Sequence, residues 1–188
     1  MPAADTKDRI DQAAISLFIS RGVDASTTKE IAAAAGISEG AIYRHYRSKD
    51  ELAVSLFMGV HKRLSSLVEE AGANVGDVNA KAAAIVAAYC EVADENWSLF
   101  TFHMLTLHRF LPHYREDGRD PVTVVERVLK QAMMDCEIPP ADPTVLAAMV
   151  IGVVIQTAQN TVYGRIDSRL TTHAPLMTKA VQAILFAR

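Results

Sequence analysis

The sequence is poor in the residues that interrupt helices or cross-link a chain. Its 188 residues include nine glycines, seven prolines and two cysteines. Because glycine and proline mark turns, their low number leaves little of the chain for loops. Half of the residues are hydrophobic and 22% are charged, which excludes a disordered chain. Cys90 and Cys136 lack the spacing of a metal-binding or redox pair, so we expect buried free thiols in a reducing compartment.

Excess positive charge and long apolar runs are also missing. The formal net charge is −3, which excludes binding driven by bulk positive charge, as in a histone-like protein or a polybasic membrane anchor. The most apolar run, residues 145–155, is shorter than the roughly 20 residues of a membrane helix, and polar residues follow it directly. We therefore expect a buried helix there, no membrane partner and a cytoplasmic protein.

Motifs of catalysis are absent as well. The chain has no glycine-rich phosphate loop, no GxSxG and no HExxH. His103 and His108 lie five residues apart, about 140° around a helix, which is a poor arrangement for a shared metal ion. We therefore expect neither an enzyme nor a bound metal or cofactor.

Hydrophobic periodicity predicts an all-α fold of about nine helices. Thr27 followed by Glu30, and Ser48 followed by Glu51, are capping boxes, in which each side chain of the pair accepts from a free amide at a helix start. Gly36 is suited to the positive φ that ends a helix. The expected helices are residues 6–21, 27–35, 38–46, 48–70, 78–94, 97–110, 122–136, 143–163 and 172–186.

The second and third helices are joined by about three residues, from Gly36 to Ser38, which can cap the third helix. So short a link makes two helices cross steeply at near contact, which small side chains permit. We therefore expect Ala32 to Ala35 to form the packing surface of a helix-turn-helix.

The third helix is expected to present one face to the DNA major groove. At about 100° per residue, Ile42 and Tyr46 fall together on the core side. The opposite side combines residues with little side chain, which permit close approach, and long polar ones, which reach base edges or phosphates. Those residues are Gly40, Ala41, Tyr43 and Arg44, with Glu39 and His45 between the two faces.

Two neighbouring residues favour phosphate contacts. Lys49 lies in the first turn of the fourth helix, where a cation opposes the helix dipole and needs another reason, such as a phosphate. Thr28 offers a hydroxyl and free amides at the start of the second helix. The positions of the basic residues, and not the net charge, indicate these phosphate contacts, because residues 25–52 contain equal numbers of bases and acids.

The segment TTKEIAAAAGISEGAIYRHYRSKDEL, residues 27–52, resembles the DNA-binding signature of the TetR family of bacterial transcriptional regulators. The likeness covers about 45 residues, beginning with the apolar pattern of the first helix. It implies a helix-turn-helix domain at residues 1–50 and a helical ligand-binding and dimerisation domain at residues 51–188. By position, the implied DNA-binding residues are Thr28, Lys29, Ser38, Glu39, Gly40, Ala41, Tyr43, Arg44, His45 and Lys49.

Glu39 departs from the lysine, arginine or glutamine often found at its position in that family. Its carboxylate either accepts a hydrogen bond from a cytosine amino group or faces water. The choice affects the operator sequence and leaves the class of function unchanged.

One recognition helix reads only a few base pairs, so two copies on a palindrome are expected. The predicted helix 143–163 lacks a polar face in its first turns, and Gly152 would let another backbone approach. The resemblance implies that the last two helices pair with those of a second copy; a core helix in a monomer is the alternative. The expected interface residues are Val145, Met149, Gly152, Val153, Gln156, Met177, Val181 and Ile184.

The segment NWSLFTFHMLTLHRF, residues 96–110, concentrates aromatic residues, methionine and histidine. This composition suits an adaptable apolar pocket and equally an ordinary core. The resemblance favours a pocket for a small apolar or aromatic effector. The candidate lining residues are Tyr89, Trp97, Phe100, His103, Met104, Met133 and Gln156.

Together these features predict a homodimeric repressor that binds a palindromic operator in double-stranded DNA and is released by a small effector. The direction of the effector's action comes from the resemblance; the sequence alone equally allows a corepressor or an activator. The rival interpretation is a helical dimer that binds protein or carries a ligand without reading DNA sequence.

Overall fold

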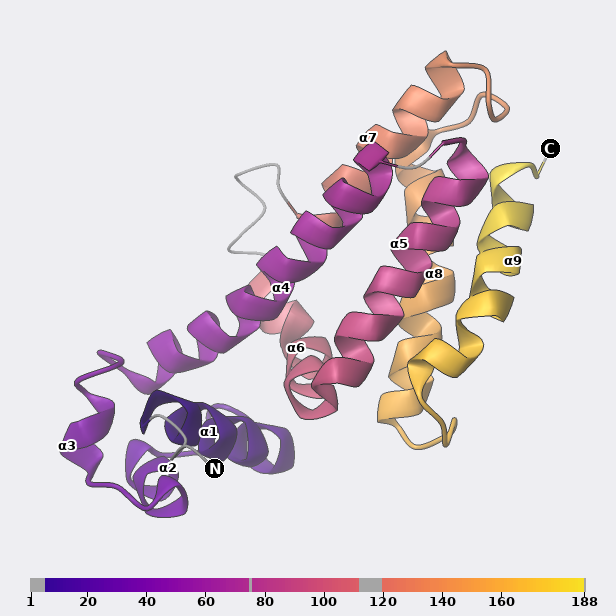
Figure 1. Cartoon of the computed structure of the whole chain (residues 1–188). Coiled ribbons are helices and arrows are strands. Elements are labelled where there is room, and N and C mark those ends of the chain that lie inside the picture. The colour runs from indigo at the N-terminus through magenta and orange to yellow at the C-terminus, as the bar shows by residue number, and fades with distance from the viewer. Residues whose placement is uncertain (1–5, 75, 112–119, 188) are drawn as a thin grey trace. The chain divides into compact units, whose positions relative to one another are not determined.

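A computed structural model describes residues 6–74, 76–111 and 120–187 (Figure 1). Over these residues the chain forms nine α-helices and no strand, which confirms the all-α prediction. The helices are α1 (Thr6–Arg21), α2 (Thr28–Ala35), α3 (Glu39–Ile42), α4 (Lys49–Asn74), α5 (Val78–Glu95), α6 (Trp97–Phe110), α7 (Pro121–Met134), α8 (Pro143–Val162) and α9 (Ala174–Leu185), with the 3-10 helix η3 (Leu170–His173) before α9.

The predicted capping box at the start of α2 is present. The amide of Glu30 donates to Thr27 Oγ1 at 3.2 Å, and the amide of Thr27 donates to Glu30 Oε2 at 2.9 Å. Gly36 ends α2 with φ 64°, as expected. Ser38 occupies the cap position of α3, but its side chain makes no capping hydrogen bond, so that part of the prediction is wrong.

The second capping box forms in altered register. The amide of Glu51 donates to Ser48 Oγ at 3.0 Å, whereas the Glu51 carboxylate accepts from the amide of Arg47, one residue earlier than expected. Both bonds satisfy free amides at the start of α4, so this helix begins where the sequence indicates.

Two helices, α3 and α4, differ most in length from the prediction. The α-helical part of α3 ends at Ile42, and a turn follows in which the amide of His45 donates to the Ile42 carbonyl at 2.9 Å. The fourth helix continues to Asn74, through much of the segment expected as a linker. Alanine is the best helix former, and Ala71 and Ala73 support this extension.

The chain divides into two compact units: Met1–Val60 with Trp97–Pro112, and His61–Asn96 with His113–Arg188. The first contains α1 to α3, the start of α4 and α6. Its core holds aromatic pairs from distant segments, with ring centroids 5.6 Å apart for Phe18 and Phe102 and 5.3 Å apart for Phe57 and Phe110. This core fixes the position of α2 and α3.

The second unit contains the rest of α4 with α5, α7, α8 and α9. The last helix packs against α5 and α8, and α7 packs against α8 (Figure 1). The Asp94 side chain, 4% exposed, accepts hydrogen bonds of 2.9 Å from the amides of Leu170 and Thr171. Burial alone would raise the pKa of this carboxyl, but these bonds, the Thr171 hydroxyl and Arg169 together lower it below its usual value. Asp94 therefore ties α5 to the segment that leads into α9.

The two cysteines are free thiols in different surroundings. Cys90 is fully buried, and burial raises the pKa of its thiol to about 12. Cys136 is exposed, so the expectation of a buried thiol is wrong there. It follows α7 with φ 58°, and its amide donates to the Met133 carbonyl at 3.2 Å to close the helix end.

Helix α8 is long and apolar enough, by length and composition, to cross a membrane, with a mean hydropathy of 1.6. The core helix of a soluble protein passes the same test. Only 28% of its most apolar stretch is buried within the chain, so the prediction of a buried helix is only partly correct. Val145 is 56% exposed and Met149 is 49% exposed.

Candidate nucleic-acid interface

The first residues of α2 and α3 meet at one exposed site. Thr28 begins α2, Glu39 begins α3, and Thr28 Oγ1 donates to Glu39 Oε1 at 2.5 Å. The Tyr43 hydroxyl lies 3.5 Å from the same threonine oxygen. The structure thus brings together three of the predicted DNA-binding residues. For Glu39 the sequence analysis expected either a bond from a cytosine amino group or exposure to water. It did not predict the hydrogen bond from Thr28.

Residues 38–46, which comprise α3 and the turn after it, are called the recognition segment below, and their outward face is open to solvent. Tyr43 is 53% exposed, whereas Ile42 is fully buried and Tyr46 is 5% exposed, which confirms the predicted core side. A Cβ placed on Gly40 would meet no atom within 4 Å, so nothing within the chain requires a glycine there. Lys29, Ser38, Glu39, Gly40, Arg44 and His45 are also exposed, and Ala41 is half-buried.

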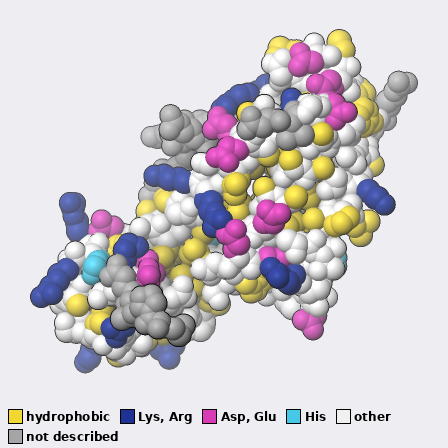
Figure 2. Space-filling view, in the orientation of Figure 1, with side chains coloured by type: hydrophobic (Ala, Val, Ile, Leu, Met, Phe, Trp, Pro, Cys, Tyr) yellow, Lys and Arg dark blue, Asp and Glu magenta, His cyan; other side chains and the backbone are white. Residues whose placement is uncertain are grey.

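Most of the acids beside this face are engaged within the chain. Glu30 contacts Arg21 at 2.9 Å, and the bonds from Thr27 lower the pKa of its carboxyl. Glu51 caps α4, and Asp50 contacts Arg109. By contrast, among the described residues the side chains of three nearby bases have no hydrogen-bond or ion-pair partner. These are Lys29, Arg44 and Arg47, and Figure 2 shows basic side chains projecting around the region where Figure 1 places α3.

Lys49 has a structural reason for its place in the first turn of α4. Its Nζ donates to the carbonyl oxygens of Ser26 at 2.7 Å and Asp24 at 3.2 Å, in the loop between α1 and α2. These two bonds explain a cation there without a phosphate, and the phosphate contact of Lys49 stays a prediction. Arg109 of α6 contacts the Asp24 carboxylate at 2.7 Å and thereby lowers the pKa of that carboxyl. The loop is held by bases from both α4 and α6.

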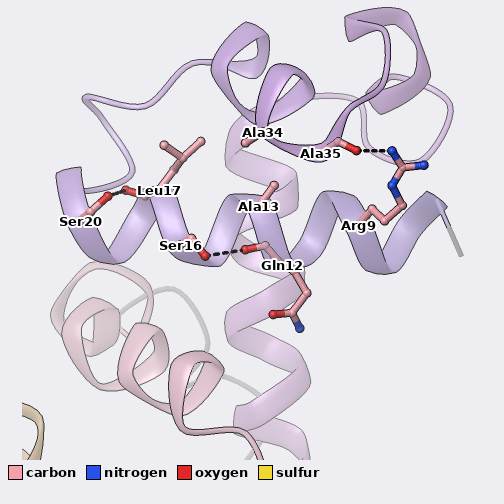
Figure 3. Close-up of a pocket in the computed structure, with 8 residues that line it drawn as sticks. All are labelled: Arg9, Gln12, Ala13, Ser16, Leu17, Ser20, Ala34 and Ala35. Carbon is pink, nitrogen blue, oxygen red and sulfur yellow. Dashed lines mark hydrogen bonds between the residues drawn. The ribbon is translucent and has the colours of Figure 1, made fainter. Parts of the chain in front are cut away.

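The four alanines of α2 do not all pack against another helix. Ala32 and Ala35 are buried, but Ala33 and Ala34 are exposed. Only two of the four alanines therefore belong to the expected packing surface. Ala34 borders an open groove between α1 and α2 (Figure 3). Its lining residues are Arg9, Gln12, Ala13, Ser16, Leu17, Ser20, Ala34 and Ala35.

Polar side chains of α1 hold both ends of the recognition segment. Arg9 Nη2 donates to the Ala35 carbonyl oxygen at 2.5 Å (Figure 3) and to the Gly36 carbonyl oxygen at 3.0 Å, at the turn before α3. After α3, the Tyr46 hydroxyl donates to Asp11 Oδ1 at 2.6 Å. Burial and this bond raise the pKa of the Tyr46 hydroxyl. These contacts could not be predicted from the sequence, because charged residues on a surface helix are normally solvated.

The candidate effector residues are divided between the two units. In the first, Phe100, His103 and Met104 are buried, and the His103 ring stacks on Phe57 with centroids 4.6 Å apart. Trp97 stacks on Phe100 at 5.7 Å. In the second, Tyr89 and Met133 are half-buried and Gln156 is exposed. That these residues line one pocket stays a prediction.

The candidate dimer residues also differ in exposure. On α8, Val145, Met149 and Gln156 are exposed, and Gly152 and Val153 are half-buried. On α9, Met177 and Val181 are buried within the chain and Ile184 is half-buried. Leu176 of α9 is 70% exposed, and Phe186, directly after α9, is 45% exposed. That the listed residues form an interface between two copies stays a prediction.

The helix-turn-helix is the part of the chain whose sequence is similar to known proteins. Residues 10–56 match the family described as bacterial regulatory proteins, tetR family. The transcriptional regulator YerO of Bacillus subtilis is 38% identical over 69 residues, which are 35% of this chain and 24% of YerO. The repressor BepR of Brucella suis is 44% identical over 54 residues, or 29% of this chain and 26% of BepR. The matched segment thus spans about a quarter of each relative's length.

Solved structures resemble the chain over almost its whole length. The fatty acid degradation regulator FadR of Bacillus halodurans has a TM-score of 0.79 and 19% identity, covering 98% of this chain and 97% of its own. FadR of Bacillus subtilis in complex with stearoyl-CoA gives 0.72 and 17%, covering 95% and 97%. SmeT, the repressor of a multidrug efflux pump of Stenotrophomonas maltophilia, gives 0.74 and 23%, covering 96% and 90%. At such low identity the likeness shows the fold alone.

Proposed function

Since this chain belongs to the tetR family of bacterial regulatory proteins, we propose that it is a transcriptional repressor that binds DNA in the cytoplasm. In this proposal two copies bind a palindromic operator, and a small molecule reduces their affinity for it. The helix-turn-helix provides the DNA contact, and the helices after residue 50 provide the effector site and the contact between copies.

The observation that carries the proposal is the meeting of the starts of α2 and α3 on one open surface. Helix starts carry free amides and partial positive charge, which favour phosphate. Thr28, Glu39 and Tyr43 converge there, and Gly40 leaves space for the edge of a base pair. Lys29 and Arg44 remain available for phosphates because neighbouring acids are bound elsewhere in the chain.

Dimerisation is supported by apolar surface that one chain leaves uncovered. Val145 and Met149 of α8 and Leu176 of α9 are each about half exposed or more. A monomeric soluble protein rarely exposes several large apolar residues on adjoining helices without a partner. Gly152 offers open space on α8, which suits the close approach of a second helix. Two copies would place recognition helices in successive major grooves, about 34 Å apart.

An effector site is supported by the aromatic and methionine content of α6. FadR of Bacillus subtilis is described with stearoyl-CoA, so the same fold occurs with a ligand of large apolar surface. Helix α4 contributes residues to both units, which makes it the proposed route between effector and DNA. The effector acts only as far as it prefers one state over the other.

The proposal is tested by gel shift with the DNA flanking the gene of this protein, at two salt concentrations. We expect binding that is specific for sequence and weakens with salt in the log-linear manner of counterion release. Binding that ignores sequence at low salt would support the rival, a helical module that carries a ligand or binds protein. Thermal shift with stearoyl-CoA and with aromatic drugs then tests the effector, because a ligand of the native state raises the melting temperature.

A further inference from the structure

Among the described residues, the Glu39 carboxylate forms no ion pair, although it lies on a surface whose other features favour DNA binding. Its side chain is exposed at the first position of α3. Within the described residues its one hydrogen-bond partner is the neutral hydroxyl of Thr28, whereas Glu30 and Asp50 contact arginines. A carboxylate beside DNA phosphates weakens the binding of every sequence, since like charges repel. It is favourable only where a base supplies a compensating contact.

The bond to Thr28 fixes one carboxylate oxygen and leaves the other available. Thr28 Oγ1 donates to Oε1 at 2.5 Å, and in the described part of the chain Oε2 receives no hydrogen bond. The Tyr43 hydroxyl lies 3.5 Å from the same threonine oxygen, so the three side chains form one cluster. Because Glu39 is already ordered, it loses less conformational freedom when it forms a further bond.

The major groove offers few partners to such an oxygen. Guanine presents two acceptors, and thymine presents an acceptor and a methyl group, none of which can donate to a carboxylate. Adenine presents an amino donor beside the N7 acceptor, a pair that an amide side chain matches. Cytosine presents an amino donor without an acceptor of its own beside it, so an ionised carboxylate, which only accepts, fits it best.

We propose that Glu39, positioned by Thr28, accepts a hydrogen bond from the amino group of one cytosine in each half of the operator. Glu39 is then a specificity-determining residue. It forms a hydrogen bond when cytosine is present, whereas on any other sequence only its repulsion from the DNA phosphates remains. This inference rests on the proposed function and adds to it the base that the helix start reads.

The test begins with selection of binding sites by the full-length protein from a random library of double-stranded DNA. Each cytosine of the selected half-site is then replaced by N4-methylcytosine, which keeps its pairing but blocks the amino hydrogen that faces the major groove. Titrations followed by fluorescence anisotropy measure each affinity. For the wild type we expect a loss of about 5- to 150-fold at one cytosine per half-site. For Glu39→Ala we expect no loss at that cytosine.

Two further variants separate reading from general charge effects. Glu39→Ala should bind a duplex of unrelated sequence more tightly than the wild type does, because a repulsive charge is gone. Glu91→Ala removes an equal charge from an exposed position of α5 and should not change that affinity. Thr28→Val keeps Glu39 but removes its anchor, so the penalty of the modified cytosine should fall between those of the wild type and Glu39→Ala. Circular dichroism melting verifies that each variant is folded.

The outcomes are distinct. An equal penalty at the modified cytosine in the wild type and in Glu39→Ala overturns the inference. An equal loss by Glu39→Ala on every duplex also overturns it, and indicates that Glu39 only positions Thr28 at a phosphate. If the wild type selects no common site, the proposed function fails and the inference fails with it. A selected palindrome without any cytosine that responds to methylation overturns the inference and leaves the proposed function standing.

Discussion

The Tyr46 hydroxyl donates a hydrogen bond of 2.6 Å to the Asp11 carboxylate, and this bond joins the end of the recognition segment to α1. Lys7 contacts the same carboxylate at 2.6 Å and lies over the Tyr46 ring at 5.5 Å. Before the other end of the segment, Arg9 donates to the Ala35 carbonyl, in the turn that precedes α3. Two residues of α1 therefore fix where α3 begins and where it ends, and we expect both to affect DNA binding without touching DNA.

Tyr46→Phe tests the first of these contacts. The ring keeps its packing, but Asp11 loses a donor, so we expect the free energy of unfolding to fall by about 1 to 3 kcal/mol. Affinity for the operator should fall as well, because α3 is less firmly held. Urea unfolding and anisotropy titration measure the two effects, and combination with Asp11→Asn should give less than the sum of the single losses. Tyr163→Phe, at an exposed tyrosine of the second unit, is the matched control. Wild-type stability in Tyr46→Phe would contradict the expectation.

Gly40→Ala tests whether a glycine at this position is required for DNA binding and not for folding. A Cβ at this position meets no atom within 4 Å, and alanine favours helix over glycine by about 1 kcal/mol or less, so stability should be unchanged or slightly higher. Operator affinity should fall, because the methyl group occupies space that a base edge needs. Gly59→Ala, at another open helical glycine, should give the stability gain without the loss of affinity. If Gly40→Ala binds its operator as the wild type does, close approach at this residue is refuted.

Lys49 and Lys29 are expected to act differently although both lie near the same surface. Lys49 donates to two carbonyls of the loop between α1 and α2, so Lys49→Ala should lower the free energy of unfolding by about 1 to 3 kcal/mol and weaken DNA binding through that loop. Lys29 has no partner among the described residues, so Lys29→Ala should leave stability unchanged. It should weaken binding to all sequences and reduce the salt dependence by roughly one phosphate contact. Melting curves and titrations at several salt concentrations distinguish the two, and a Lys49→Ala protein as stable as the wild type would refute the structural role.

The sequence predicted what depends on local patterns and missed what depends on side chains meeting across the fold. Thr27, Glu30 and Gly36 mark their helix ends because caps are set by residues within one turn. The partner of Lys49 could not be predicted, since a lysine in a first turn has the same sequence pattern whether it binds a phosphate or a carbonyl. Asp94 lies in the sequence between Glu91 and Glu95, which are exposed. Its burial could not be predicted, because it results from the packing of Leu170, 76 residues later, against its side chain.

The exposed face of α9 likewise depends on how side chains pack across the fold. Helical periodicity shows that apolar residues share a stripe, but a helix with apolar residues on more than one side allows several choices of inner face. Met177 and Val181 take the inner positions against the same unit, and Leu176 and Phe186 are left outside. Which stripe a partner covers depends on packing that the sequence alone does not determine.

Gly152→Leu tests the proposed contact between copies. No atom lies within 4 Å of a Cβ at this position, so a larger side chain should leave the folding of one chain intact. It should hinder a second helix from approaching α8, which would convert the dimer to monomer and lower operator affinity, because each half-site would be bound alone. Sedimentation or light scattering measures the mass, with Gly59→Leu as the control for an added apolar side chain. A dimer of wild-type strength in Gly152→Leu would place the interface elsewhere.

Asp94→Asn should show a dependence on pH whose sign follows from the lowered pKa of the carboxyl. A carboxyl whose pKa is lower in the folded state than its usual value near 3.8 stabilises the fold above that value. This stabilisation is lost as the pH falls through the folded pKa, because both states are then protonated.

We expect Asp94→Asn to lower the free energy of unfolding by about 1 to 3 kcal/mol at neutral pH, since a charged acceptor of two amides becomes a neutral one. Urea unfolding from pH 7 to below pH 3.8 should show the difference from the wild type shrinking only in the acid range, whereas Glu91→Gln should show no such change. A difference that stays constant over the whole range would mean that Asp94 contributes through its shape and not through its charge.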